Sequence, residues 1–353
     1  MKKIISLILA VIIAFGACVC AGAVDLRPQV GKLREQFKTG EGPVAGSYSV
    51  EYMYYSPVKA NDTKKYPLVI WFHGMSDGSY NGEQVNENYV AFWASDEFQS
   101  RFGDVDGAFI LAPRSREEFQ DYWGTSMIMP TRAAIDDFIK KYGDNIDLSR
   151  IYLGGYSMGG KMVYNMAVAY PDMFAAIFPI CPATSPSTSQ FELIKDIPVW
   201  LTSGKPDPIV NYSKSVAPGW ERLCSTSAVA EDCRFTTLDK VCFADGEACP
   251  SAHYAWFAVN NDMFAYDDGD YPYASTVDGK GNTVKLKSPN GMISWLYSFT
   301  SDYDGTPATD MGNLEGTGST SSIISLILSF VDLADIFRKV FDFFMSILAK
   351  FAF

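Results

Sequence analysis

The sequence predicts an α/β protein whose central sheet is mostly parallel and flanked by helices. Short, continuous apolar runs, bounded by glycine, proline or polar residues, are typical of parallel strands buried on both faces. Helical stretches with an apolar side alternate with these runs, as in repeated strand–helix–strand units. The composition, 48% hydrophobic and 20% charged over 353 residues, provides enough apolar side chains for one large core.

The elements are expected in a definite order along the chain. An alternation of aromatic and polar residues at 46–57 predicts an early strand of an antiparallel edge. Buried strands are expected at 67–72, 108–113, 151–153, 174–180 and 197–201, and helices at 131–142, 158–170 and 289–299. Thr131 is the expected N-cap of the first helix, Pro171 stops the second, and Pro289 begins the third.

Residues 1–23 are interpreted as a secretory signal peptide, which makes the mature chain a secreted or cell-surface protein beginning near Val24. Two lysines precede an apolar run at 4–15, and residues 21–23 read Ala-Gly-Ala, a small-residue cleavage site. A retained membrane anchor is disfavoured because the run is shorter than the roughly 20 residues that span a bilayer. Lipidation of Cys18 is also disfavoured, since Phe15 stands where a small aliphatic residue is expected.

The remaining chain divides into one large domain and a tail. Residues 24–303 are expected to form the domain, and 304–322, rich in Gly, Thr, Ser and Asp, a linker. Residues 323–353 place most polar side chains three or four positions apart, which predicts an amphipathic helix with a wide apolar face. Its charges disfavour a bilayer span. We expect it to associate with a membrane or cell surface or a partner, or to pack on its own domain.

Residues 212–250 interrupt the strand–helix rhythm and are interpreted as a cysteine-rich insertion beside the site. In an oxidising compartment their four cysteines would form two disulfides, and three pairings are open. Adjacent pairing closes the shortest loops. The candidates are Cys224, Cys233, Cys242 and Cys249. A zinc site is disfavoured, because this set has no C-x-x-C pair and no histidine, and no metal is expected. Cys181 follows an apolar run and is expected to be a small buried residue.

The net charge of −12 argues against a nucleic-acid partner. An acidic protein repels the phosphate backbone and gains nothing from the release of counterions.

Gly155-Tyr156-Ser157-Met158-Gly159 is the motif with the clearest chemical meaning. It follows the strand at 151–153 and opens the helix at 158–170, so Ser157 is expected on a tight turn with its hydroxyl above the sheet. Glycines at both ends suit a turn that brings backbone segments close together. The sequence therefore predicts Ser157 as a nucleophile.

A serine hydroxyl becomes a good nucleophile when a base removes its proton, and histidine is the usual base. The chain has two histidines. His73 ends the first buried strand, where a loop donates an oxyanion-hole N–H, whereas His253 follows the nucleophile late in the domain. We therefore expect His253 to be the base. Asp207, in the turn after the strand at 197–201, is the expected carboxylate that orients it, with Asp262, Asp267 and Asp268 as alternatives.

Two backbone N–H groups are expected to form the oxyanion hole, those of Met158 and Met75. Aromatic side chains near the site are candidates for substrate contacts, because they stack on flat faces of sugars or aromatic acids. The candidates are Trp123, Tyr156 and Trp256, with Tyr122 and Tyr254 beside them.

These segments resemble the esterase and "predicted peptidase" branch of the α/β-hydrolases, which includes feruloyl esterases, acetyl-xylan esterases and polyhydroxybutyrate depolymerases. The resemblance covers about residues 45–300. It is carried by Trp71-Phe72-His73-Gly74, Ala112-Pro113-Arg114, residues 150–160, Pro171-Asp172-Met173-Phe174, Pro198 to Asp207, His253-Tyr254-Ala255-Trp256 and Ser294-Trp295-Leu296. One departure is Ser203-Gly204, where such proteins often carry His-Gly. The cysteine-rich segment and the tail lie outside the resemblance.

The resemblance implies an α/β-hydrolase fold with the chain order nucleophile, acid, histidine, and it implies ester cleavage more than peptide cleavage. We expect a secreted serine esterase, without a cofactor, acting on small-molecule or polysaccharide-linked esters such as acyl or feruloyl groups. The alternatives are a secreted serine peptidase and a non-catalytic surface protein that keeps the fold.

Overall fold

The structure, a computed structural model, describes residues 25–75, 77–78, 82–86, 89–116, 122–243, 245–261, 273–285 and 291–306. The signal segment, the tail at 323–353, most of the linker, and Asp262, Asp267 and Asp268 lie outside these residues. Of the helices in the described ranges, none combines the length and apolar character needed to cross a membrane.

The described strands form one sheet with the order β1-β2-β4-β3-β5-β6-β7-β8-β9. The strands from β4 to β8 pair in parallel, whereas β1, β2 and β9 add antiparallel edges, which confirms the predicted, mostly parallel sheet. The strands are β1 (Lys38–Glu41), β2 (Glu51–Tyr55), β3 (Tyr66–Phe72), β4 (Phe109–Pro113), β5 (Ile146–Tyr156), β6 (Ala176–Ile180), β7 (Trp200–Gly204), β8 (Arg234–Leu238) and β9 (Ala274–Asp278).

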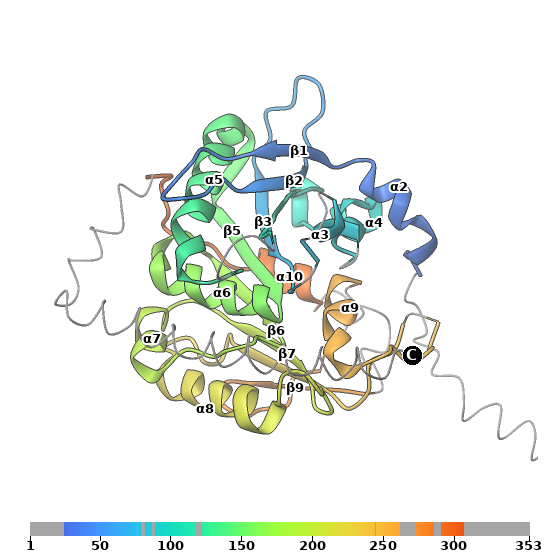
Figure 1. Cartoon of the computed structure of the whole chain (residues 1–353), viewed down its shortest axis with the longest axis vertical. Helices are drawn as coiled ribbons and strands as arrows, with labels where there is room; N and C mark the ends of the chain where they lie inside the picture. Colours follow the sequence, from blue (N-terminus) through green and yellow to red (C-terminus); the bar gives the residue numbers. More distant parts are fainter. Residues whose placement is uncertain are drawn as a thin grey trace, which may run out of the picture.

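Two apolar cores cover the two faces of this sheet. Every residue of β3 is buried, and its side chains alternate between the cores: Leu68 and Ile70 face one, and Val69 and Trp71 face the other. Figure 1 shows α5, α6 and α7 on one side of the sheet and α2, α4 and α9 on the other. The helices are α2 (Val30–Arg34), α3 (Glu83–Asn86), α4 (Asp96–Gln99), α5 (Ile128–Tyr142), α6 (Met158–Ala169), α7 (Thr188–Leu193), α8 (Ala217–Thr226), α9 (Ala255–Asn260) and α10 (Met292–Tyr297).

Helix α5 begins earlier than the sequence predicts. Ile128 is its first residue, so Thr131 is not its N-cap, and Pro130 lies inside the first turn. A proline is compatible with that position because the first N–H groups of a helix have no intrahelical partner. Helix α6 ends at Ala169, close to the predicted stop at Pro171.

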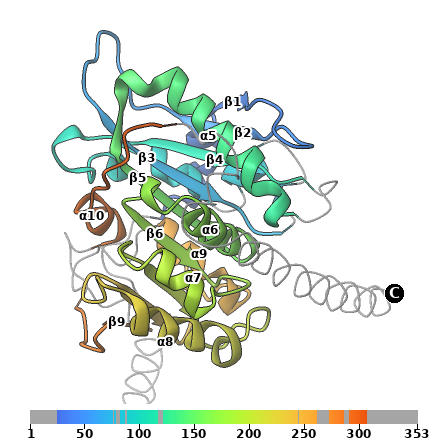
Figure 2. The ribbon, with the colours of Figure 1, turned by 90° about the vertical axis from the view of Figure 1, so that its left-hand side faces the viewer.

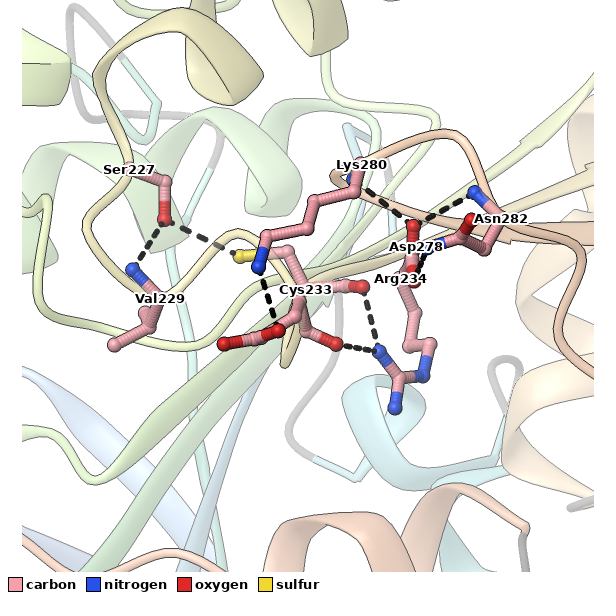
Figure 3. Close-up of polar contacts among 8 residues, drawn as sticks. Ser227, Val229, Cys233, Arg234, Asp278, Lys280 and Asn282 are labelled. Atoms are coloured by element: carbon pink, nitrogen blue, oxygen red, sulfur yellow. Dashed lines mark hydrogen bonds and ion pairs between the residues drawn. The ribbon is translucent and has the colours of Figure 1, made fainter.

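The segment 212–250 is not an insertion, which corrects the prediction. It contributes α8, which packs beside α7 as Figure 2 shows, and β8, which pairs with β7 and β9 inside the sheet. The turn beyond β9 closes on the segment before β8: Lys280 pairs with Glu231, and the Asp278 carboxylate accepts from the backbone N–H of Asn282 at 2.8 Å (Figure 3). Short strands between many polar residues concealed this regular structure from pattern analysis.

The five described cysteines are thiols. Cys224 lies near Cys233, and Cys249 near Cys242, which are the adjacent pairs. Burial, as the larger cause, and the neighbouring Cys233 raise the pKa of Cys224 to about 12. Burial and the neighbouring Cys242 likewise raise the pKa of Cys249 to about 12. Disulfide formation therefore stays a prediction.

Candidate active site

Ser157 lies at a sharp turn between β5 and α6. Its backbone has φ 56° and ψ −118°, a region that side-chain-bearing residues rarely adopt. Three hydrogen bonds hold it there. The Ser157 N–H donates to the Ile180 carbonyl at 2.9 Å, and the Ser157 carbonyl accepts from the N–H groups of Ala183 at 2.9 Å and Lys161 at 3.1 Å. The turn is thus fixed by the end of β6 and by its own helix.

The motif glycines are required by close backbone contacts. A Cβ on Gly155 would stand 2.6 Å from the Phe72 carbonyl oxygen, and one on Gly159 would stand 2.1 Å from the same atom. The turn can therefore pack against the end of β3 only without these side chains. This is the physical reason for glycine at both ends of the motif.

His253 and Asp207 form a hydrogen-bonded pair. His253 Nδ1 lies 2.7 Å from Asp207 Oδ2, and the Asp207 side chain is completely buried. The other carboxylate oxygen accepts from the backbone N–H groups of Ile209 at 2.8 Å and Val210 at 3.0 Å. Burial alone would raise the pKa of Asp207, but the bond and charge of His253 and these N–H groups lower it below its usual value. Asp207 is therefore held as a carboxylate.

The imidazole of His253 lies beside the Ser157 turn. Its ring centre is 6.0 Å from that of Tyr156, the residue before Ser157, and 14% of its side chain is exposed. The loop that carries it begins at Ser251, whose hydroxyl accepts from the His253 N–H at 3.1 Å. That loop rests on Gly204, where a Cβ would stand 2.3 Å from the Ala252 carbonyl oxygen.

His73 is a structural residue of the neighbouring loop. It is completely buried, and Nε2 accepts from the Ser115 N–H at 3.0 Å, so the proton on Nδ1 faces the Gly74 carbonyl at 2.6 Å. Burial, opposed by the charge of Asp77, lowers the pKa of His73 to about 4. Both ring nitrogens are engaged and the ring is neutral, so His253 is the histidine available to act as a base.

The loop that carries Met75 is fixed to the nucleophile turn and to the core. The Tyr156 hydroxyl donates to Asp77, which ties the motif directly to this loop. Trp123 donates from its indole N–H to the His73 carbonyl at 2.8 Å. The structure thus gives two residues proposed for substrate contact a role in positioning the loop that carries Met75.

The three aromatic candidates are all buried, with exposed fractions of 0% for Trp123, 7% for Tyr156 and 4% for Trp256. Trp256 packs with its ring centre 5.6 Å from Tyr156 and 5.2 Å from Tyr254. Trp123 packs against Phe72 and His73. Tyr156 therefore packs between His253 and Trp256, whereas Trp123 packs at the end of β3.

Sequence reasoning missed one residue of the site, Cys181. It directly follows β6, is completely buried, and has a backbone φ of 40°. Cys181, Asp207 and His253 each have one side-chain atom of a kind that binds metal ions, and these three atoms lie within 4.8 Å of one another. Its position at the carboxyl end of a parallel strand, the same sheet edge that carries Ser157, is the signal that could have placed it here.

A cavity of about 1000 Å³ lies at the opposite edge of the sheet. It is lined by Tyr170, Phe174 and Pro198, which precede β6 and β7, and by the segment 299–304. It is therefore separate from the Ser157 turn.

Comparisons with known proteins give consistent matches. Residues 115–237 match the sequence model of the phospholipase/carboxylesterase family. The bifunctional acetylxylan esterase/xylanase XynS20E of Neocallimastix patriciarum is 27% identical over 150 residues, 42% of this chain. The chain spans a fifth of that relative's length, 20%. The crystal structure of a thermostable esterase superposes with a TM-score of 0.56 and 23% identity, covering 76% of this chain and 64% of that one, and this likeness shows the fold.

Proposed function

We propose that this chain belongs to the esterase branch of the α/β-hydrolase superfamily and hydrolyses carboxylic esters through an acyl-enzyme on Ser157; the three comparisons support this proposal. The observation that carries the proposal is the 2.7 Å hydrogen bond between His253 and the buried carboxylate of Asp207, beside the strained Ser157 turn. A nucleophile, a base and a group that orients the base are the parts that acyl transfer requires.

The reaction follows from this arrangement. Ser157 Oγ attacks the ester carbonyl while His253 Nε2 takes its proton. Asp207 accepts the hydrogen bond from His253 Nδ1–H, which fixes the tautomer and stabilises the imidazolium. His253 then returns the proton to the leaving alcohol. A water molecule attacks the acyl-enzyme with the help of the same base, which releases the acid and Ser157.

The backbone N–H groups of Met158 and Met75 would bind the negative oxygen of the tetrahedral intermediate. Met158 is the first residue of α6, so its N–H is at the positive end of the helix dipole. Met75 lies within the loop that Trp123 and Tyr156 hold at His73 and Asp77. Fixed donors of this kind cost no reorganisation during the reaction.

For the substrate we propose acyl esters on small molecules or on polysaccharide, including acetyl and feruloyl groups. The similarity to a relative named as an acetylxylan esterase supports a carbohydrate-linked ester. The signal-like segment at 1–23 supports action outside the cell, where such polymers are found.

The test is a panel of nitrophenyl esters, acetylated and feruloylated oligosaccharides, and peptides, assayed with the purified mature chain. Ser157→Ala should lower ester hydrolysis by at least about 10³-fold and abolish labelling by a fluorophosphonate. Ser225→Ala is the matched control, because Ser225 is an exposed serine on α8. Turnover of peptides without turnover of esters would identify a peptidase. A correctly folded chain that neither reacts with fluorophosphonate nor hydrolyses any ester would refute the proposal.

A further inference from the structure

Three different metal-ligating side chains meet beneath the Ser157 turn. Cys181 follows β6, Asp207 follows β7, and His253 lies after β8, so parallel strands bring them to one sheet edge. One Cys181 sulfur, one Asp207 carboxylate oxygen and one His253 ring nitrogen lie within 4.8 Å of one another. The hydrolytic mechanism uses two of these residues and leaves the thiol without a role.

We propose that Cys181, Asp207 and His253 form a binding site for a thiophilic divalent metal ion such as Zn²⁺ or Cd²⁺, and that the bound ion inhibits the enzyme. The inhibition, but not the binding, rests on the proposed function.

The ligand set matches the chemistry of these ions. Thiolate, imidazole and carboxylate bind Zn²⁺ at about 2.3, 2.0 and 2.1 Å, and tetrahedral geometry then separates the ligand atoms by about 3.3–3.6 Å. In the structure Nδ1 and Oδ2 are 2.7 Å apart, and the three ligand-type atoms lie within 4.8 Å of one another. Metal binding would therefore widen the Nδ1–Oδ2 separation by about 0.6 Å and shorten the separations from the sulfur by at most about 1.3 Å. Mg²⁺ and Ca²⁺ prefer oxygen ligands, so the thiol selects against them.

Access is through the imidazole, the only one of the three side chains that has measurable exposure: 14% for His253 against none for the Asp207 side chain and 0% for Cys181. The thiol also lies beside Ser203, whose Oγ is 3.9 Å from Cys181 Sγ. A solvent molecule on the His253 side would complete the coordination.

Binding would inactivate His253 by changing its tautomer. The metal replaces the proton on Nδ1, and that proton moves through solvent to Nε2, so the ring stays neutral. The Cys181 thiol loses its proton to solvent as the metal–sulfur bond forms. Nε2 then carries a hydrogen and has no lone pair to accept the proton of Ser157. A chelator that removes the ion should restore activity.

The first test measures ester hydrolysis at increasing Zn²⁺, Cd²⁺ or Mg²⁺. Zn²⁺ and Cd²⁺ should inhibit reversibly and Mg²⁺ should not. Cys181→Ser should raise the inhibition constant for Cd²⁺ at least about tenfold, each variant being compared with its own metal-free rate. Cys233→Ser is the matched control, because that cysteine is also buried but precedes β8, at the end of the strands opposite the dyad, and it should leave the inhibition constant unchanged. Equal inhibition of the Cys181→Ser and unmodified enzymes would overturn the proposal.

The second test does not need activity. Cd²⁺ titration of Ser157→Ala should produce the ultraviolet absorption of a thiolate bound to cadmium. Adding Cys181→Ser or Cys181→Ala to this variant should remove the part of the absorption that corresponds to one Cd²⁺ ion per chain. If these double variants do not fold, the test is the anomalous scattering of Cd²⁺ in crystals of the Ser157→Ala chain. We expect an anomalous peak within bonding distance of Cys181 Sγ. No such peak overturns the proposal. A Cys181-dependent cadmium signal, together with an unmodified chain that hydrolyses no ester, would uphold the site and refute the proposed function.

Discussion

Replacing Ser157 by glycine should make the protein more stable while removing its activity. The φ of 56° and ψ of −118° at this position belong to a region that glycine adopts freely and other residues do not. The neighbouring bonds to Ile180, Ala183 and Lys161 hold the backbone in place, so the serine cannot relax. Ser157→Ala keeps this strain and serves as the reference that lacks the hydroxyl.

The expected magnitude is a difference between two opposing effects. A residue held in such a region costs about 1–3 kcal/mol. Glycine in place of alanine lowers stability by about 0.5–1 kcal/mol, because the unfolded chain gains freedom. The free energy of unfolding of Ser157→Gly should therefore exceed that of Ser157→Ala by about 1 kcal/mol, and by about 2.5 kcal/mol at most.

Urea unfolding at equilibrium, followed by tryptophan fluorescence, measures this difference. The control pair is Ser225→Gly and Ser225→Ala in the exposed part of α8, where glycine should be less stable by about 1 kcal/mol. The sign of the difference must thus reverse between the two positions. Should glycine at 157 be the less stable variant, as it is at 225, the turn is not strained and its backbone does not pre-position the hydroxyl.

Three further predictions concern the surroundings of the turn. His73 is neutral in the fold, and burial lowers its pKa from 6.5 to about 4, so the unfolded chain binds its proton first as the pH falls. The stability that neutral His73 contributes is complete above pH 6.5 and declines by about 3 kcal/mol down to pH 4. The free energy of unfolding, measured across this pH range, should show this decline in the unmodified chain and not in His73→Asn. Gly159→Ala should lower the free energy of unfolding by about 3 kcal/mol or more, or prevent folding, because its Cβ would stand 2.1 Å from a backbone oxygen of β3. Gly143→Ala is the control: its Cβ would have nothing within 4 Å, so this variant should fold normally in expression and melting assays. Tyr156→Phe removes the hydrogen bond to Asp77 and should lower kcat about tenfold with little change in KM; an unchanged kcat would mean that the bond does not position the loop.

The sheet was predictable because its central strands are buried on both faces. A strand such as β3 reads as an uninterrupted apolar run, and the alternation of runs and helices fixes the parallel arrangement. The expected positions of Ser157, Asp207 and His253 follow from the same logic, since each comes after a strand and parallel strands end at one edge. The structure places the histidine and the aspartate in contact, although neither their distance nor their burial can be read from the sequence.

The edge of the sheet was not predictable in this way. Strand β8 has only five residues and lies between polar segments, so it forms no long apolar run, and its identity depends on pairing with β7 and β9. Pairing between distant segments leaves no periodic signal in either one. The start of α5 was missed for a related reason, because Pro130 looks like a boundary but lies within the first turn.

Ser203-Gly204, where the esterases that this chain resembles often carry His-Gly, has a physical account in the structure. Gly204 is needed because the loop of His253 packs directly on its backbone, with the Ala252 oxygen 2.3 Å from the position of a Cβ. The side chain at 203 has no such contact with the dyad; it is buried and faces the Cys181 sulfur at 3.9 Å. A serine there occupies little space, so the thiol can lie close to Asp207 and His253. A larger residue at 203 would press on the thiol, so Ser203→His should weaken metal inhibition more than it weakens ester hydrolysis, which inhibition curves for the two enzymes would measure. If hydrolysis were lost and inhibition kept, position 203 would instead support the dyad itself.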